Sequence, residues 1–373
     1  MKFTVSSKTL YDGLSKISGL IGTNNIISIL DNSLLRLEKG KLTAISSDIE
    51  NSMKIEIEVD SDYEGSMAIP AKKMLETLKF MPEQPLLINM NVDEKSVEFN
   101  SSNGKYKLAG FDANEFPKIP EIADTNSVMV SADALLKAIN TTSFAIGNDE
   151  QRKAMTGLFC QFDQDSATFV ATDAQKLVRY TRRDVKTNNT FSFILPKKVL
   201  GQLKSLLSSV SGDVELTFNK TNCAFKFGNL YIICRLIDAN FPEYNNVIPP
   251  DNPNKMTVGR EGLLNTLRRL APLTNQTTHQ VSFKIEGSKL IASALDLDFA
   301  SGGNEEQPIS YIGDDMTIGF SSKYLGEILQ TIHTEDITFE MSTPSRAGLI
   351  FPVNEEENES TLMLLMPILV SVE

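Results

Sequence analysis

The sequence predicts an α+β fold in which one domain of about 125 residues occurs three times, each copy with two helices packed on an antiparallel sheet. The first observation is a lysine marker. Lys73, Lys198 and Lys323 stand 125 residues apart, and an apolar pair follows each of them. The second is an aspartate that recurs at nearly the same spacing, and the third is an amphipathic helix at the front of every copy. Because three independent markers share one period, the repeat belongs to the whole chain.

Six helices are expected, because apolar residues recur with helical spacing in six stretches. In the first stretch Leu10, Tyr11, Leu14 and Ile17 form one buried stripe. Leu135, Leu136 and Ile139 do the same in the third stretch, and Val199, Leu200, Leu203, Leu206 and Leu207 in the fourth. Proline or serine opens the second helix of each copy, as the first positions of a helix favour. The expected helices cover residues 6–21, 70–80, 131–147, 196–209, 259–275 and 321–334.

The rest of each copy is expected to form roughly eight short strands. The run from Met53 to Val59 alternates apolar and charged residues, as a strand with one buried face does. Asp48, Asp173 and Asp296 each follow a β-like stretch. Since the same residue type recurs once per copy, these aspartates are expected to serve strand ends or turns, not one active site.

Two similar phrases mark the ends of the first and second copies. Residues 112–120 read DANEFPKIP, and residues 238–249 read DANFPEYNNVIP. Phe116 and Phe241 are expected to anchor the chain on the completed domain, while the prolines stiffen the crossing. A plain proline-containing linker is the alternative. The expected domains are residues 1–125, 126–252 and 253–373.

The chain is acidic, but its expected helices are basic. The formal net charge of −12 argues, on its face, against a nucleic-acid partner. The six helices nevertheless carry thirteen lysines and arginines against five acidic residues. A basic helical surface poor in aromatic residues suits contacts to a phosphate backbone and offers little for reading bases. For any single helix, a solvated face is the alternative. The helix residues expected to face DNA are Lys72, Lys73, Lys137, Lys197, Lys198, Lys204, Arg268, Arg269 and Lys323.

Geometry limits how such domains can surround a duplex. A domain of this length is equivalent to a sphere of about 18 Å radius. Three touching spheres leave a hole of about 3 Å radius and six leave about 18 Å. Duplex DNA, judged from its groove depths, has a radius of about 10 Å. One chain therefore cannot encircle DNA, whereas two three-domain arcs closed head to tail can.

The sequence contains no sign of an enzyme, a metal site or a membrane span. His279 and His333 have no metal-ligand spacing around them, and the P-loop, G-x-S-x-G and G-x-G-x-x-G motifs are missing. The three cysteines are odd in number and widely spaced, which predicts neither a disulfide framework nor a zinc site. There is no apolar run near 18 residues and no signal-peptide core. We therefore expect no cofactor, and a location in the reducing cytoplasm at the nucleoid.

Four stretches resemble the bacterial DNA polymerase III β subunit family, the replicative sliding clamps. They are MKFTV at the start, ATDAQKL at 171–177, FPEYNNVIP at 241–249 and LMP at 365–367. With the triple repeat, the resemblance covers the whole chain. It implies three DNA-clamp domains per chain and a head-to-tail homodimeric ring that slides on duplex DNA without catalysis. It also implies a clamp loader that opens the ring, and short peptides that tether replicative polymerase and repair proteins to it.

Carried over position by position, the resemblance implies a partner-peptide pocket between the second and third domains. Ala174, Gln175 and Lys176 replace the family's Gly-His-Arg, and Asn246 replaces a common arginine, so the peptide preference is expected to differ. The residues that match the pocket are Arg152, Met155, Thr172, Ala174, Gln175, Lys176, Leu177, Pro242, Asn246, Val247, Tyr324, Leu365, Met366, Pro367 and Ile368.

Three further positions follow from the resemblance. Asn24 stands where the family often has an arginine in a loop near the DNA. Tyr106 and Leu273 match positions at the family's subunit interface, although each is equally well explained as an ordinary core residue. The tail runs six residues past Pro367, which can narrow the pocket.

A repeat-built scaffold that never touches DNA is the competing interpretation of the whole chain.

Overall fold

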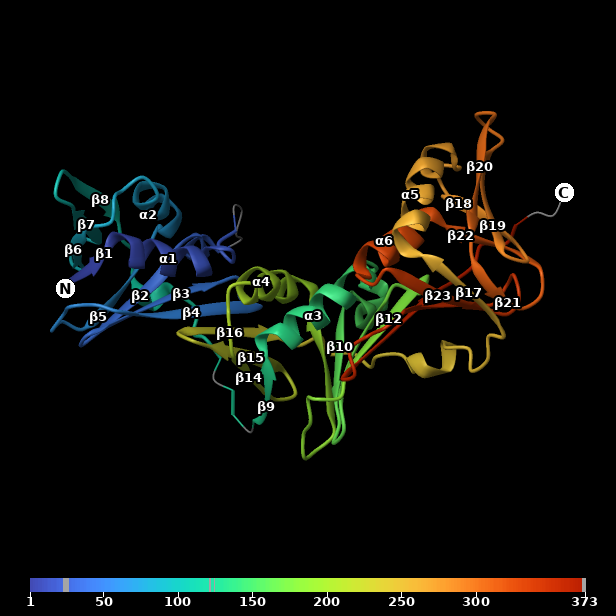
Figure 1. Ribbon diagram of the computed structural model, residues 1–373. Coiled ribbons are helices and arrows are strands. Elements are labelled where there is room, and N and C mark those ends of the chain that lie inside the picture. Colours follow the sequence, from blue (N-terminus) through green and yellow to red (C-terminus); the bar gives the residue numbers. More distant parts are fainter. Residues whose placement is uncertain (23–26, 121, 124, 371–373) are drawn as a thin grey trace. The chain divides into compact units, whose positions relative to one another are not determined.

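The computed structural model describes residues 1–22, 27–120, 122–123 and 125–370 (Figure 1). They form two compact units, one of Met1–Asp133 with Gly201–Leu236 and one of Ala134–Leu200 with Ile237–Glu373. Asn24 lies outside the described residues. The repeat predicted from the sequence is present as an order of elements: a strand, a helix, four strands, a helix and three strands.

The first copy follows this order, with one 3-10 segment, η1 (Ser28–Asp31), between its first helix and its second strand. Its elements are β1 (Lys2–Ser6), α1 (Ser7–Ser18), β2 (Ser33–Glu38), β3 (Lys41–Ser47), β4 (Asn51–Glu58), β5 (Gly65–Ile69), α2 (Ala71–Leu78), β6 (Pro85–Asn91), β7 (Ser96–Asn100) and β8 (Lys105–Ala109). The alternating burial predicted for Met53–Val59 is found in β4, where Met53, Ile55 and Ile57 are buried.

The second copy has the same order of elements. They are β9 (Asn126–Ser131), α3 (Ala132–Thr142), β10 (Gly157–Phe162), β11 (Ala167–Thr172), β12 (Lys176–Arg182), β13 (Phe191–Pro196), α4 (Lys197–Leu207), β14 (Asp213–Phe218), β15 (Asn222–Phe227) and β16 (Leu230–Arg235). Two short 3-10 segments, η3 (Ser143–Ala145) and η4 (Glu150–Thr156), precede β10.

The third copy adds one short strand, β21, to the common order. Its elements are β17 (Asn254–Gly259), α5 (Arg260–Leu270), η6 (Ala271–Leu273), β18 (Gln280–Glu286), β19 (Lys289–Asp296), β20 (Ser301–Pro308), β21 (Ser310–Ile312), β22 (Met316–Ser321), α6 (Ser322–Thr331), β23 (Asp336–Met341), β24 (Gly348–Pro352) and β25 (Glu359–Leu365).

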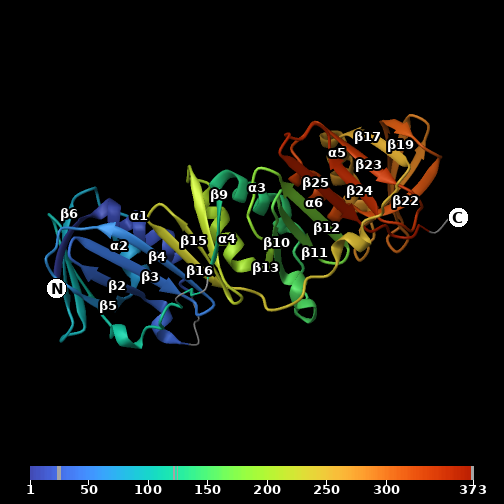
Figure 2. The ribbon, with the colours of Figure 1, turned by 90° about the horizontal axis from the view of Figure 1, so that it is seen from below.

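Each unit contains two antiparallel sheets, which Figure 2 shows from a second direction. In the first unit their strand orders are β1-β6-β7-β8 and β5-β2-β3-β4-β16-β15-β14-β9. In the second unit they are β13-β10-β11-β12-β25-β24-β23-β17-β21 and β20-β19-β18-β22. Consecutive copies therefore share a sheet, because β16 pairs with β4 and β25 pairs with β12. The three copies of the repeat therefore form two compact units, because the second copy contributes strands to a shared sheet in each unit.

The helices pack by the apolar stripes that the sequence predicts. In the first unit α1 contacts α2, β3 and β4, and in the second α5 contacts α6, β19 and β20 (Figure 1). This arrangement confirms the α+β class with helices on antiparallel sheets. Tyr11, Leu136 and Leu206, expected to be buried, are only half-buried. Neighbouring helix residues point about 100° apart, so these three lie at the border of their stripes.

The recurring aspartates close turns, as predicted. One carboxylate oxygen of Asp48, of Asp173 and of Asp296 accepts the N–H of a residue two or three positions later, at 2.6, 2.9 and 3.0 Å. Such a bond is the defining contact of an aspartate turn.

Both linker phenylalanines anchor the chain, also as predicted. Phe116 is buried in a cluster with Leu34, Ile45 and Ala68, and Phe241 stacks on Phe159 with ring centroids 4.6 Å apart.

Candidate functional site

The β11–β12 turn holds four of the residues expected in the pocket. Thr172 Oγ1 donates to the carbonyl of Lys176 at 2.8 Å and accepts the N–H of Ala174 at 3.1 Å. Asp173 Oδ1 accepts the N–H groups of Gln175 and Lys176, each at 2.9 Å. Ala174 has a φ of +74°, which costs a residue with a β-carbon about 1–2 kcal/mol. The turn is therefore fixed by its own hydrogen bonds in a conformation that a glycine would adopt without this cost.

Lys176 is a buried cation at the centre of this site. Its Nζ lies 2.7 Å from Asp173 Oδ2, 3.2 Å from Glu327 Oε2 and 4.2 Å from the centre of the Tyr324 ring. Burial alone would lower the pKa of Lys176, but the hydrogen bonds and charges of the two carboxylates outweigh it and raise the pKa. The lysine stays charged and ties the turn to α6.

A hollow of about 390 Å³ opens beside this lysine. Of the residues expected in the pocket, it is lined by Arg152, Met155, Gln175, Lys176 and Tyr324. They come from three separate segments: η4, the β11–β12 turn with the first residue of β12, and α6. The remaining lining residues are Phe144, Ile146, Gly147, Asn148, Asp149, Asp173, Lys197, Lys323 and Glu327. The hollow thus mixes apolar surface with both signs of charge, a composition suited to a peptide with apolar and polar side chains.

The second linker lies against an apolar cluster next to the turn. Leu177 belongs to that cluster, and Phe241, Tyr244 and Ile248 pack against it. The expected pocket residues of this segment, Pro242, Asn246 and Val247, are exposed, with Val247 at 57%. Their side chains are open to a ligand while their neighbours hold the linker in position.

The last strand approaches the same turn. The N–H of Met366 donates to the carbonyl of Gln175 at 2.9 Å, and Leu365 stands opposite Lys176 in the β12–β25 pair. Leu365 is buried, Met366 is exposed, and Pro367 and Ile368 are half-buried. The N–H of Ile368 donates to the carbonyl of Gly319 at 2.8 Å, so the tail continues along β22.

The expected pocket residues thus form two neighbouring groups. Five line the hollow, whereas Leu177 belongs to the apolar cluster and Pro242, Asn246 and Val247 lie exposed on the linker that packs against it. Sequence reasoning missed Glu327 and Asp173 as partners of Lys176, although the recurrence of Asp173 was a usable signal. It also placed Lys197 and Lys323 only among the DNA-facing residues, whereas both line this hollow.

We call the strand pair through which two copies share a sheet a joint. The joint between the first two copies, β16 with β4, lies within the first unit. The N–H of Arg235, the last residue of β16, donates to the carbonyl of Glu50 at 2.9 Å. Glu50 directly precedes β4. Three residues further in on both strands, Ile232 stands opposite Met53, and both are fully buried.

The joint between the second and third copies, within the second unit, obeys the same rule. The N–H of Met366, directly after β25, donates to the carbonyl of Gln175, which directly precedes β12. Three residues further in, Met363 stands opposite Val178, and both are fully buried. The two joints share one register, with a methionine opposite a β-branched residue in each.

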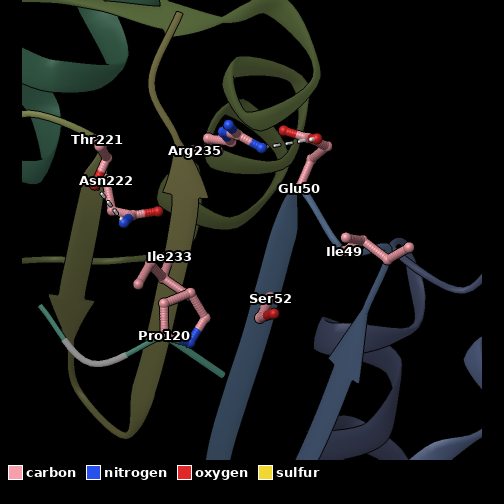
Figure 3. Close-up of a pocket in the computed structure, with 8 residues that line it drawn as sticks. All are labelled: Ile49, Glu50, Ser52, Pro120, Thr221, Asn222, Ile233 and Arg235. Atoms are coloured by element: carbon pink, nitrogen blue, oxygen red, sulfur yellow. Dashed lines mark hydrogen bonds and ion pairs between the residues drawn. The ribbon is translucent and has the colours of Figure 1, made fainter. Parts of the chain in front are cut away.

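The first joint also has a hollow, of about 330 Å³ (Figure 3). Figure 3 shows Glu50 and Arg235 facing one another across its mouth, with their charged groups 3.8 Å apart. Both side chains are exposed, so this pair adds little stability. Ile49, with a φ of +79°, lines the same hollow. The complete lining is Ile49, Glu50, Ser52, Pro120, Thr221, Asn222, Ile233 and Arg235.

The helix residues expected to face DNA are mostly exposed. Lys73, Lys197, Lys198, Lys204, Arg268, Arg269 and Lys323 are exposed, and Lys72 and Lys137 are half-buried. Lys72 Nζ donates to the carbonyl of Gly22 at 3.1 Å, and Lys197 Nζ to Asn148 Oδ1 at 2.9 Å. Arg269 makes two 2.6 Å bonds to Glu305, which lower the pKa of that carboxyl to about 2.

Lys137 belongs to a charged network in the second unit. Its Nζ lies 2.6 Å from Glu359 Oε1, and Arg182 Nη1 lies 2.6 Å from the same atom. Arg182 also holds Asp184 with bonds of 2.8 and 2.6 Å, which lowers the pKa of that carboxyl. Glu359 starts β25 and Arg182 ends β12, so the network closes the far end of the second joint.

Each of the four sheets has two edge strands among the described residues, and β8 and β20 are two of these eight. Tyr106 lies on β8, is 37% exposed and stacks on the buried Phe99 with ring centroids 4.9 Å apart. Leu273 lies in η6, next to β20. A β-carbon added at Gly303 of β20 would lie 2.9 Å from Leu273 Cδ1. Both residues expected at a subunit interface therefore lie at an open edge.

The described residues hold no group of three or more His, Cys, Asp or Glu side chains that suits a metal ion. Cys160, Cys223 and Cys234 are buried thiols without disulfides. Burial raises the pKa of Cys234 to about 12. Among the described parts of the chain, no helix is long and apolar enough to cross a membrane.

Three copies of one domain, joined through shared sheets, define a clamp-type fold. Family models of the DNA polymerase III beta subunit match residues 1–120 (N-terminal domain), 129–243 (central domain) and 245–368 (C-terminal domain). The chain belongs to the DNA polymerase III beta subunit family.

Individual relatives match along their full length. The beta sliding clamp of Synechococcus elongatus is 25% identical, with 99% of each chain covered. That of Pseudomonas aeruginosa is 25% identical over 98% of this chain and 99% of the relative. The fold matches the crystal structure of the Pseudomonas aeruginosa DNA polymerase III subunit beta bound to griselimycin. The TM-score is 0.93 at 23% identity, over 99% of this chain and 100% of that one. The family consists of DNA sliding clamps, which are processivity factors and not catalysts. This confirms both the function and the non-enzymatic nature expected from the sequence.

Proposed function

We propose that two copies of this chain close head to tail into a ring around duplex DNA, and that the ring holds partner proteins by short peptides in a pocket made of the hollow beside Lys176 and the exposed linker residues Pro242, Asn246 and Val247. As a DNA sliding clamp, the chain has DNA and polymerase as partners. Homodimer closure, the peptide pocket and the use of that pocket by polymerase, clamp loader and repair proteins are the proposed refinements.

The observation that carries the proposal is the rule shared by the two joints. Each joint pairs the last strand of one copy with the third of four consecutive strands of the neighbouring copy. In one chain, two such pairs are made, and the corresponding strands left open are β8 and β20. A second copy offers the missing partner for both, which is how a head-to-tail interface closes into a ring.

The rule predicts the register of the third joint. Ala109 is the last residue of β8, and Ala300 directly precedes β20, so the N–H of Ala109 is expected to donate to the carbonyl of Ala300 in the second copy. Three residues further in, Tyr106 then stands opposite Gly303. Gly303 has no side chain to cover Leu273, and the Tyr106 ring has the size to fill that space. A large side chain opposite glycine thus replaces the methionine and β-branched pair of the other joints.

Charge complementarity supports the same pairing. β8 carries Lys105 and Lys107, whereas β20 carries Glu305 and Glu306. In the predicted register Lys105 faces Asn304, with Glu306 diagonal to it on the same face of the sheet, where opposite charges attract.

A cysteine pair tests the register directly. In the variant K105C/N304C the two new thiols oppose one another only between copies, so mild oxidation is expected to give a covalent dimer. The native thiols are buried and do not compete. A chain with K105C alone is the control. No covalent dimer in the double variant, or equal amounts in both, would refute the joint.

The same variant tests encirclement. It is mixed with a nicked circular plasmid, oxidised and passed through gel filtration in high salt, which removes proteins held only by phosphate contacts. A closed ring is expected to stay with the circle and to leave it after the plasmid is cut once. A scaffold that ignores DNA elutes alone in both cases, and a simple DNA-binding protein is removed by salt in both.

The peptide pocket needs its own test, because a ring can close without it. Peptides selected from a random library on the wild-type chain are measured against V247S, whose side chain is 57% exposed. The control is M129S, on β9, with an exposure of 56%. We expect V247S to lose about tenfold or more in affinity for the selected peptides and M129S to lose none. Equal binding to both variants would refute the pocket.

A further inference from the structure

The end of β19 and the turn between β19 and β20 present large apolar side chains to solvent. Leu295 is 59% exposed, and Leu297 and Phe299 are each 76% exposed. β19 and β20 run side by side in the second unit (Figure 1). Clustered exposed side chains of this size usually mark an interaction surface. These side chains are not buried in the core of their own domain, so only a contact with another chain can remove them from water.

This turn is as short as its counterpart in the first copy but more apolar. Asp296 pairs with Ser301 and Ser47 pairs with Ser52, so four residues lie between the last paired positions in both. Two of the four in the third copy, Leu297 and Phe299, are large and apolar, and they lie beyond the end of the strands, next to the open edge of β20.

At Gly302 the backbone of β20 is not covered by a side chain. A β-carbon added at Gly302 would lie 3.4 Å from Leu295 Cδ1 and 3.1 Å from the carbonyl of Ala294. Glycine inside a strand often marks a place where another chain approaches closely. With no side chain at Gly302, a strand paired to β20 comes within reach of Leu295 on the face opposite to Leu273.

The first joint shows what surrounds the residue that precedes the acceptor of the joint hydrogen bond. There Ile49, directly before the acceptor Glu50, and Arg235, whose N–H makes the joint bond, line one hollow (Figure 3). Phe299 directly precedes Ala300, as Ile49 directly precedes Glu50. The equivalent of Arg235 is Ala109 of the second copy.

We propose that Leu297 and Phe299 fill the corresponding hollow at the joint between two copies, packing on Ala109 and Phe111 of the second chain. Phe111 is 40% exposed, and its backbone is fixed by hydrogen bonds to Ala68 in both directions. The inference rests on the proposed ring and extends its interface. At the first joint, within one chain, the hollow is open. At the joint between the two chains, Leu297 and Phe299 occupy the corresponding position and form an apolar contact, which we call the latch.

The variant L297S/F299S tests the latch. Its dimer dissociation constant is measured by sedimentation velocity over a dilution series and compared with wild type. We expect it to rise on the order of ten- to a hundredfold, because two large apolar side chains lose their cover. I312S, with a side chain 74% exposed on β21, is the matched control and is expected to leave the constant unchanged. Melting temperatures of all variants verify that the fold persists.

The coupling to the second chain is tested with F111S. If Phe299 and Phe111 touch across the joint, the combined variant F299S/F111S loses less affinity than the two single variants together. A wild-type dimer whose constant changes less than about twofold in L297S/F299S would overturn the latch and leave the ring intact. A wild-type chain that stays monomeric would overturn both.

Discussion

Removing the carboxylate of Glu359 is expected to destabilise the second unit by about 2–3 kcal/mol. Glu359 is 7% exposed, and its Oε1 accepts from Arg182 and Lys137 at 2.6 Å each. Loss of one partner from a buried ion pair costs about 3–5 kcal/mol. Here the cost is reduced, because Arg182 keeps Asp184 and Lys137 keeps Glu356 at 3.4 Å. The Lys137 side chain is 38% exposed, so water screens its share and Arg182 carries most of the effect.

The change to test is E359A, with E359Q as its matched control. The glutamine keeps the shape and one acceptor oxygen, so it is expected to lose roughly half as much stability as the alanine. Urea unfolding by circular dichroism gives the free energy, and hydrogen exchange on β12 and β25 localises the loss. If E359A unfolds within about 0.5 kcal/mol of wild type, the network contributes nothing net and the reasoning fails.

Three further changes have outcomes fixed by the structure. Replacing Lys197, Lys198 and Lys204 with alanine is expected to lower the slope of log affinity against log salt on duplex DNA by about 2–3, and an unchanged slope would remove α4 from the DNA contact. Lys176 has a raised folded-state pKa, so its stabilisation is complete below the ordinary value of 10.5 and is lost as pH rises through the folded pKa. The melting-temperature gap between wild type and K176M should therefore stay constant up to about pH 10.5 and narrow as the pH rises further, and a gap that stays constant there would contradict the buried charge. Cys234, with a pKa of about 12, should resist a thiol reagent at pH 8 in the folded chain and react after unfolding; rapid native labelling would show that the burial is wrong.

Much of the fold was predictable because the repeat supplied each pattern three times. The lysines at 73, 198 and 323 each stand near the start of a helix that buries an apolar stripe, and all six helices are present with ends up to five residues shorter. The strand that precedes the first helix of each copy was not expected. β1 is only five residues long, KFTVS, and its alternation is too short to distinguish from the start of a helix.

The sharing of sheets was beyond the sequence patterns. A strand such as β4 looks the same whether its neighbour is β5 or β16, because the pairing is made by main-chain groups. For the same reason the environment of Lys176 was hidden. Nothing local predicts that Glu327, on a helix of the next copy, completes its ion pairs.

At the strand joints, the two paired strands belong to different copies of the repeat. Their contact therefore does not require that one strand follow the other along the chain. Met53 with Ile232 and Val178 with Met363 exchange the two residue types between strands, yet the backbone bonds are the same. A joint of this kind does not depend on where the chain begins. In the proposed ring, a circularly permuted chain that starts at β9 would therefore keep every strand pair, while the position of its ends would change.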